Sequence, residues 1–410
     1  MSLLLHFRKL PRELKLFIFA SILIGLAFNI YDSTFNNFLN SKFSISGFQR
    51  SFLEVPREIP GFLVVFISAL LWFLCSRRLA GLAMLFGAAG SWLAGYFSPT
   101  FGIMSIWIFT YSVGNHIWMP LSSAIGMELA DKGHVGTRLG QLNSLRNFAA
   151  IIGSFVVFLG FKYLKFTFNI TFTITAILLC LAAILFFRME PKPRHKQGSF
   201  LVVHKEYNLY YFLSILFGSR KQIFITFAPW VLVTIFKQPT QTMATLLIVG
   251  GVIGIFFQPL LGKMIDTLGE KKVLEAESVA LVFVCLAYGF ARFILPEKTA
   301  LIVTFVCFLV DQVLLSVNMA RATYMNKIAL SPEDVQPALT FSVTIDHVFS
   351  ISIALVGGLI WNTFGYQYVF IIGVMIAVIN FFAARRINIP EQHKPALAQI
   401  IVRDISSSDS

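Results

Sequence analysis

Charged side chains are scarce in this chain of 410 residues. Asp, Glu, Lys and Arg together make up 13% of it, about half the share found in ordinary soluble domains. Apolar residues make up 57%, and 44 residues are Phe. The apolar residues run in blocks of about twenty, the length of helix that crosses ~30 Å of hydrocarbon. Because a helix satisfies its own backbone hydrogen bonds inside a bilayer, the sequence predicts an all-α integral membrane protein.

Cysteine is also rare. The four cysteines, Cys75, Cys180, Cys285 and Cys307, each lie in or at the edge of an apolar block. Their spacing matches neither a disulfide framework nor a metal site. We therefore interpret them as small buried side chains, and we predict no metal site and no cofactor.

Enzymatic signatures are absent from the sequence. It contains no H-E-x-x-H, no G-x-S-x-G and no G-x-x-x-x-G-K-[ST] pattern. Without a phosphate-binding loop, the chain cannot drive transport by hydrolysing a nucleotide on its own. We predict no catalytic residues and no enzymatic activity, and a membrane enzyme is the least favoured interpretation.

The chain carries a formal net charge of +13. If both termini are cytoplasmic, most Lys and Arg residues fall in cytoplasmic loops and tails, as the positive-inside rule requires. The charge therefore indicates membrane topology rather than a nucleic-acid partner. We expect a monomer in the cell (inner or plasma) membrane, whose partners are the lipid bilayer, a small-molecule solute and protons.

One short charged stretch separates two of the apolar blocks, residues 240–261 and 273–296. It reads Gly262-Lys263-Met264-Ile265-Asp266-Thr267-Leu268-Gly269-Glu270-Lys271-Lys272. Glycines at either end permit tight backbone turns, and the Asp can accept hydrogen bonds from a helix N-terminus. The Lys pair is typical of a cytoplasmic loop. A plain solvated basic loop is the alternative interpretation.

The spacing of this stretch resembles the loop signature of the major facilitator superfamily, G-x-x-x-D-x-x-G-x-[KR]-[KR]. The resemblance implies twelve transmembrane helices in two six-helix bundles that rock about a central site. It also implies a gating role for Gly262, Asp266, Gly269, Lys271 and Lys272. The matching place in the first half reads Leu74-Cys75-Ser76-Arg77-Arg78-Leu79, which keeps the basic pair but lacks the Asp and the glycines.

Twelve apolar blocks follow one another along the chain. We predict helices over residues 14–39, 49–75, 79–97, 102–127, 138–161, 166–187, 208–236, 240–261, 273–295, 299–325, 335–361 and 366–384. This pattern predicts an N-terminal bundle over 1–187, a basic cytoplasmic linker over 188–207, a C-terminal bundle over 208–386 and a cytoplasmic tail over 387–410. A weak repeat, Ser21–Gly25 against Ser214–Gly218, agrees with two related halves.

Polar residues inside these blocks mark the candidate site, because charges in hydrocarbon are costly. Asn29, Asp32, Ser33 and Asn36 share one face of the first predicted helix. That stripe predicts either the lining of a cavity or a hydrogen-bonded seam between helices. A desolvated carboxyl group can exchange protons near neutral pH, so we predict proton coupling through Asp32, with Asp311 and Asp346 as reserves.

Eleven further polar or aromatic positions are predicted to bind the solute. They are Asn29, Asn36, Asn115, His116, Arg146, Arg220, Lys221, Gln222, Trp230, Asn318 and Arg321. The amides and Trp suit a hydroxylated or zwitterionic solute, whereas the cations suit an organic anion. Ion pairs within the protein, such as Arg220 or Lys221 with Asp32, are the alternative for the charged members.

A separate run of charges, Arg50, Glu54, Arg57 and Glu58, opens the block 49–75. Its spacing of three and four residues places opposite charges side by side on a helix. We interpret it either as an outer gate or as a self-neutralised cluster of ion pairs.

The sequence as a whole predicts a secondary transporter that moves a small polar or anionic organic solute by alternating access, coupled to protons. An exporter of drugs, or of divalent metals through Asp32, Asp346 and His347, is the alternative within the fold. A membrane receptor or scaffold that transports nothing is the alternative from another class. Charges paired only with one another would favour that receptor, and a cavity with unpaired Arg and Asp would favour transport.

Overall fold

The computed structural model describes residues 10–70, 75–130, 135–191 and 204–389. Within these ranges the chain is helical and contains no strand. The helices are α2 (Arg12–Phe43), α3 (Gly47–Phe52), α4 (Glu54–Leu70), α5 (Ser76–Tyr96), α6 (Phe101–Glu128), α7 (Val135–Tyr163), α8 (Phe168–Arg188), η1 (Lys205–Tyr207), α9 (Asn208–Thr234), α10 (Thr240–Ile294), α11 (Glu297–Leu314), η2 (Leu315–Val317), α12 (Asn318–Ile328), α13 (Pro332–Phe364) and α14 (Tyr366–Arg385). Eight helices of the described part are long and apolar enough to span a membrane. This confirms the all-α membrane protein.

Helix α10 contains both apolar blocks that flank the charged stretch. A straight helix of its 55 residues would be about 80 Å long, far more than a bilayer. The chain turns back at Gly269, whose φ of 83° and ψ of 160° lie outside the helical region and favour glycine. Residues 262–268 continue the helix. The prediction of a loop over all eleven residues is therefore wrong, because one glycine makes the turn.

Two other predicted helices are interrupted. Block 49–75 forms the short α3 and the longer α4, which meet at Leu53. Ser46 and Gln49 cap the start of α3 reciprocally, with the Ser46 hydroxyl accepting from the Gln49 backbone N–H. Block 299–325 forms α11 and α12 on either side of the 3-10 turn η2. The predicted single helices are therefore wrong at these two places.

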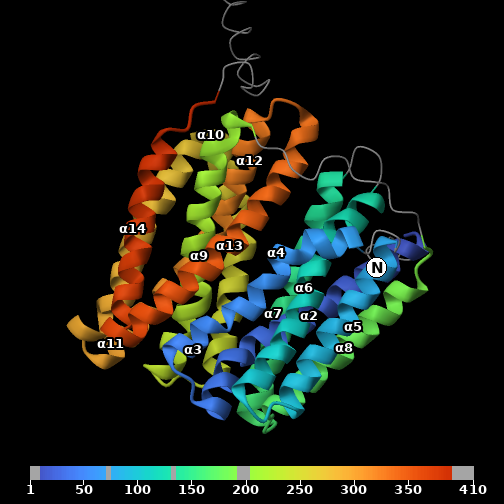
Figure 1. The fold of residues 1–410 in the computed structure, drawn as a ribbon, viewed down its shortest axis with the longest axis horizontal. Helices are drawn as coiled ribbons and strands as arrows, with labels where there is room; N and C mark the ends of the chain where they lie inside the picture. The colour runs from blue at the N-terminus through green and yellow to red at the C-terminus, as the bar shows by residue number, and fades with distance from the viewer. Residues whose placement is uncertain (1–9, 71–74, 131–134, 192–203, 390–410) are drawn as a thin grey trace, which may run out of the picture.

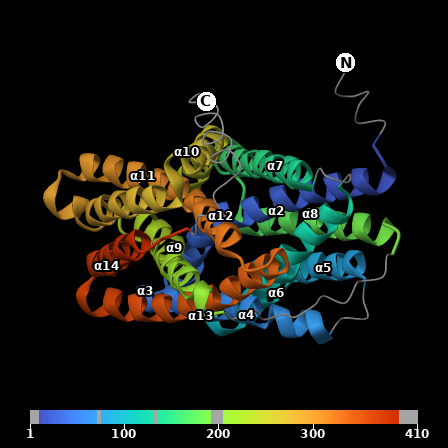
Figure 2. The same ribbon diagram turned by 90° about the horizontal axis from the view of Figure 1, so that it is seen from above.

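The helices gather into two groups. Buried apolar side chains of α9 to α14 form one large cluster, and those of α2 to α8 form another, which Trp230 of α9 joins. Figure 1 shows the two groups side by side. The main contacts between them are α10 against α7 and α13 against α3 and α4, and these helices lie side by side in Figure 2. The arrangement agrees with two bundles; residues 192–203 of the predicted linker and 390–410 of the tail lie outside the described ranges.

The two groups meet most closely at one end of the molecule, which we call the α3 face. There the Asn37 side chain donates to the backbone oxygen of Gln238 at 3.0 Å, and the Phe48 N–H donates to Asn362 at 3.3 Å. At the opposite end, the ion pairs of Arg77 with Glu13 and Glu128 stay within one group. If the termini are cytoplasmic, as predicted, the α3 face is the outer end.

Candidate functional site

A cavity of about 380 Å³ lies among α2, α6 and α7, within the size range of small-ligand pockets. Its polar lining comes from all three helices and from positions where the sequence shows isolated polar residues. These lining residues include Asn29, Asp32, Asn115, Trp118, Ser122, Asn143, Arg146 and Asn147. Three of the predicted solute-binding residues, Asn29, Asn115 and Arg146, therefore meet the first candidate for proton coupling in one place.

Asp32 is the acidic group of this cavity. Its side chain is exposed although it lies within the membrane-spanning helix α2. No hydrogen bond or ion pair to its carboxylate occurs among the residues that the structure describes. The adjacent Ser33 is buried instead and lies 3.2 Å from the Ser154 hydroxyl, which also donates to Asn29. The polar stripe of α2 thus both lines the cavity and forms a seam with α7.

Arg146 is the cationic group of the same cavity. Its guanidinium donates to the Ser122 hydroxyl at 3.0 Å and to the amide oxygen of Asn143. Within the described ranges it contacts no carboxylate. Both partners are neutral, so the charge of Arg146 remains available to an anionic group of a bound molecule.

The charges of α9 and its neighbours have a different arrangement. Arg220 donates to Asp311 at 2.5 Å and to Glu277 at 3.2 Å, and Arg321 donates to Glu277 at 2.8 Å. These side chains are at most 4% exposed. Arg220, Arg321 and Asp311 were predicted as site residues, and the structure pairs them in a buried network. Sequence reasoning missed Glu277, although two glutamates inside the block 273–296, Glu275 and Glu277, were a usable signal.

The other predicted residues of the second half are also engaged or lie apart. Lys221 lies 2.5 Å from the Asp346 carboxylate. Gln222 donates to Glu54 and to Thr226. Trp230 is 1% exposed and packs in an apolar core. Asn318 is exposed at the start of α12.

Asn36 and the predicted gating residues lie outside the cavity lining. Asn36 accepts a hydrogen bond of 2.9 Å from the Arg50 side chain at the α3 face. Asp266, Lys271 and Lys272 are exposed around the turn at Gly269, and Gly262 has open space around it. In this turn the buried residue is Glu270, which pairs with Lys327 of α12 at 2.7 Å. That contact was not predicted.

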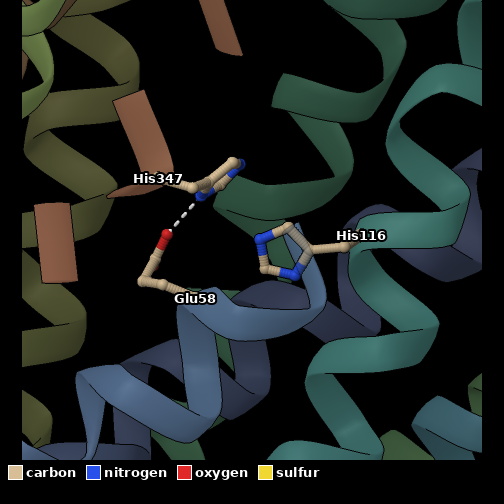
Figure 3. A group of neighbouring side chains, drawn as sticks. All are labelled: Glu58, His116 and His347. Carbon is tan, nitrogen blue, oxygen red and sulfur yellow. Dashed lines mark hydrogen bonds and ion pairs between the residues drawn. The ribbon is translucent and has the colours of Figure 1, made fainter. Parts of the chain in front are cut away.

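A third cluster joins the two groups of helices. Glu58 of α4 lies 2.5 Å from Nδ1 of His347 of α13, and the ring of His116 of α6 lies 4.9 Å from that of His347. Figure 3 shows the three side chains converging. Nδ1 of His116 lies 2.9 Å from both the hydroxyl and the backbone oxygen of Ser112.

Comparison with known families decides the class of this fold. The model of the Major Facilitator Superfamily matches residues 17–329. The chain belongs to the major facilitator superfamily. This places the cavity, and the contacts between the two bundles, in a family of membrane transporters.

Solved structures of the superfamily resemble this chain over nearly their whole length. A nucleoside transporter, NupG, has a TM-score of 0.72 at 16% identity, covering 92% of this chain and 98% of its own. A D-xylose-proton symporter has a TM-score of 0.69 at 15% identity, covering 92% and 97%. A POT family transporter in complex with 5-aminolevulinic acid has a TM-score of 0.69 at 12% identity, covering 91% of this chain and 95% of its own. At such identities the likeness shows the fold. A comparison with curated sequences finds no match.

Proposed function

We propose that this protein is a secondary active transporter that moves a small polar or anionic organic solute by alternating access, coupled to protons. The observation that carries the proposal is the cavity among α2, α6 and α7, where Asp32 has no partner in the described part of the chain and Arg146 has only neutral ones. Unpaired charges within a membrane are costly, so their presence indicates that a function requires them. A receptor or scaffold would have no need of them.

The lining of the cavity favours a particular class of solute. Its amides can both donate to and accept from hydroxyl groups, and Trp118 offers a flat apolar face. The guanidinium of Arg146 can bind a carboxylate or phosphate through two parallel hydrogen bonds. The names of the fold neighbours mention nucleosides, D-xylose and 5-aminolevulinic acid. Those molecules are hydroxylated or zwitterionic, as the lining favours.

Ion pairs at two of the three candidates for proton coupling support the choice of the third. Asp311 is bound to Arg220, and Asp346 is bound to Lys221, so protonating either would break an ion pair. Asp32 has no hydrogen bond or ion pair to break within the described residues, and it lines the cavity that the solute would enter. We propose that Asp32 takes up and releases the coupled proton, in a protein of the cell membrane with both termini cytoplasmic.

The test is transport by the purified chain in liposomes that contain a pH-reporting dye. Sugars, nucleosides, organic acids and amino acids are added in turn to wild type, to Asp32→Asn and to Glu297→Gln. Glu297 is an exposed acid at the start of α11, far from the cavity lining. We expect a solute-dependent proton flux that Asp32→Asn loses and Glu297→Gln keeps. A full flux in Asp32→Asn would remove that residue from the mechanism.

A further inference from the structure

The cluster of Glu58, His116 and His347 has no role in the transport cycle proposed above. It draws on three helices: α4 and α6 from the first group and α13 from the second (Figure 3). One ligand atom of each side chain lies within 4.8 Å of the other two. The two imidazoles are buried, at 8% and 6% exposure.

Two imidazole nitrogens and one carboxylate oxygen form a donor set that zinc uses in proteins. Zinc binds these atoms at ~2.0–2.2 Å, so neighbouring ligands of a tetrahedral ion are ~3.3 Å apart. In the structure the closest pair, His347 Nδ1 and Glu58 Oε2, is 2.5 Å apart, and no pair exceeds 4.8 Å. Side-chain movements of roughly 1 Å would bring all three into that geometry.

His116 is oriented as a metal-binding histidine would be. Its Nδ1 is held at 2.9 Å by the backbone oxygen of Ser112, the kind of outer contact that fixes the ring of a ligand. The Nε2 atom has no hydrogen-bond partner in the described ranges, and Figure 3 shows it facing Glu58 and His347. This leaves a neutral imidazole nitrogen free to bind an ion.

The backbone of α4 holds the two rings in place. Gly61 lies so close that a Cβ there would be 2.6 Å from Cδ2 of His116 and 2.6 Å from Nε2 of His347. Any larger residue would push the rings apart. The glycine therefore permits the close approach on which the cluster depends.

We propose that Glu58, His116 and His347 bind a Zn²⁺ ion, and that the bound ion holds the two bundles closed at the α3 face. Binding displaces the proton of the hydrogen bond between His347 and Glu58, and it converts one contact between the bundles into a three-ligand link. The ion acts as a clamp on the conformational cycle. The proposal does not depend on the solute carried.

The first experiment measures metal binding by the purified full-length chain. Zn²⁺ is titrated by calorimetry, and Co²⁺ is titrated while its visible absorption is recorded. We expect one ion per chain, with each of Glu58→Gln, His116→Gln and His347→Gln weakening binding at least ~10-fold. His204→Gln is the matched control, because His204 lies 3.8 Å from Asp334 and belongs to no three-ligand group of the described residues. If wild type binds no ion, or if only His204→Gln weakens binding, the site does not exist.

The second experiment tests the clamp. Ser51 of α3 is fully buried and lies against Gly358 of α13. A cysteine at position 51 should therefore react only when the α3 face opens. In a background in which serine replaces the four native cysteines, Zn²⁺ should slow the reaction of Ser51→Cys with a membrane-impermeant maleimide. Adding His347→Gln should abolish the slowing. An unchanged rate in the presence of bound Zn²⁺ would refute the clamp while leaving the site.

Discussion

Gln222 of α9 donates a hydrogen bond of 2.8 Å to Glu54 of α4, so the two bundles meet through a buried polar contact. The other oxygen of Glu54 accepts from Arg50 at 2.5 Å and from Arg57 at 2.8 Å. The charge run at the start of this block therefore fits both interpretations of the sequence. It neutralises itself, and it also contributes to the closure of the α3 face.

The contact between Gln222 and Glu54 should stabilise that closure. A hydrogen bond to a charged group contributes about 1.5–3 kcal/mol, or roughly a 10- to 100-fold change in an equilibrium. We expect Gln222→Ala to speed maleimide labelling of Ser51→Cys by a factor in this range. Gln367→Ala, which removes a side chain that donates to the backbone oxygen of Phe364 three residues earlier, is the control and should leave the rate unchanged. Equal labelling of both variants would contradict the assignment.

The buried network around Glu277 should be important for stability. Arg321→Met leaves one oxygen of Glu277 without its guanidinium, and breaking a buried ion pair costs about 3–5 kcal/mol. We expect a loss of this size in the free energy of unfolding in detergent. The double variant Arg321→Met with Glu277→Gln should recover part of it. Arg385→Met, at an exposed position of α14, should change little; a neutral Arg321→Met would show that the network carries no stability.

Arg146 should select for negatively charged solutes. Its charge is the only one contributed by α7 to the cavity lining, and loss of a charged hydrogen bond costs about 1.5–3 kcal/mol. We expect Arg146→Gln to weaken binding of an anionic solute ~10- to 100-fold and to leave a neutral sugar nearly unaffected, as measured by calorimetry. Arg292→Gln serves as the control, because Arg292 bonds a backbone oxygen at the α3 face. Equal losses for both solutes would exclude charge recognition.

Gly90 should be intolerant of any side chain. A Cβ there would lie 2.7 Å from the backbone oxygen of Trp107, so Gly90→Ala must separate α5 from α6, at a cost of about 1–3 kcal/mol. Gly140→Ala meets open space in α7 and should gain up to about 1 kcal/mol from helix propensity. Thermal unfolding of the two variants should move in opposite directions. A shared direction would contradict the packing at Gly90.

Asp334 should make the start of α13 sensitive to acid. The Tyr207 hydroxyl donates to its carboxylate at 2.7 Å and lowers the pKa of Asp334. Because the folded pKa lies below the unfolded value of about 3.9, the contribution to stability is present above that value and is lost as pH falls through the folded pKa. Tyr207→Phe should therefore flatten the decline of the unfolding midpoint below about pH 4. Tyr163→Phe, at an exposed site, should keep the wild-type slope.

The helices themselves could largely be predicted, because the length and periodicity of an apolar block are local properties. Block 138–161, for example, became α7 over Val135–Tyr163. The break at Leu53 and the turn at η2 could not be predicted in this way. The break at Leu53 lies three residues before Pro56, which has no N–H for the helical hydrogen-bond ladder. The chain around η2 contains neither proline nor glycine.

The candidate site was only partly predictable for a similar reason. Helical spacing indicates which residues share a face, so Asp32 and Asn29 could be placed together. It does not indicate which helix lies opposite, so Arg220 was considered for Asp32 whereas it pairs with Asp311. The weak repeat proved informative. Gly25 packs against α7 at Arg146, and Gly218 packs against α13 at Asp346, so the matched glycines make equivalent contacts in the two bundles.

Four polar contacts join the bundles in the part of the chain that the structure describes: Asn37 with Gln238, Phe48 with Asn362, Glu54 with Gln222 and Glu58 with His347. They have a consequence for measurements made on opposite sides of a bilayer. A solute arriving at the α3 face must wait for all four to separate, so only a fraction of the molecules can accept it at any time. The apparent affinity is reduced by that fraction. The solute concentration needed for half-maximal transport should therefore be higher from the α3 face than from the other side, although the cavity is the same.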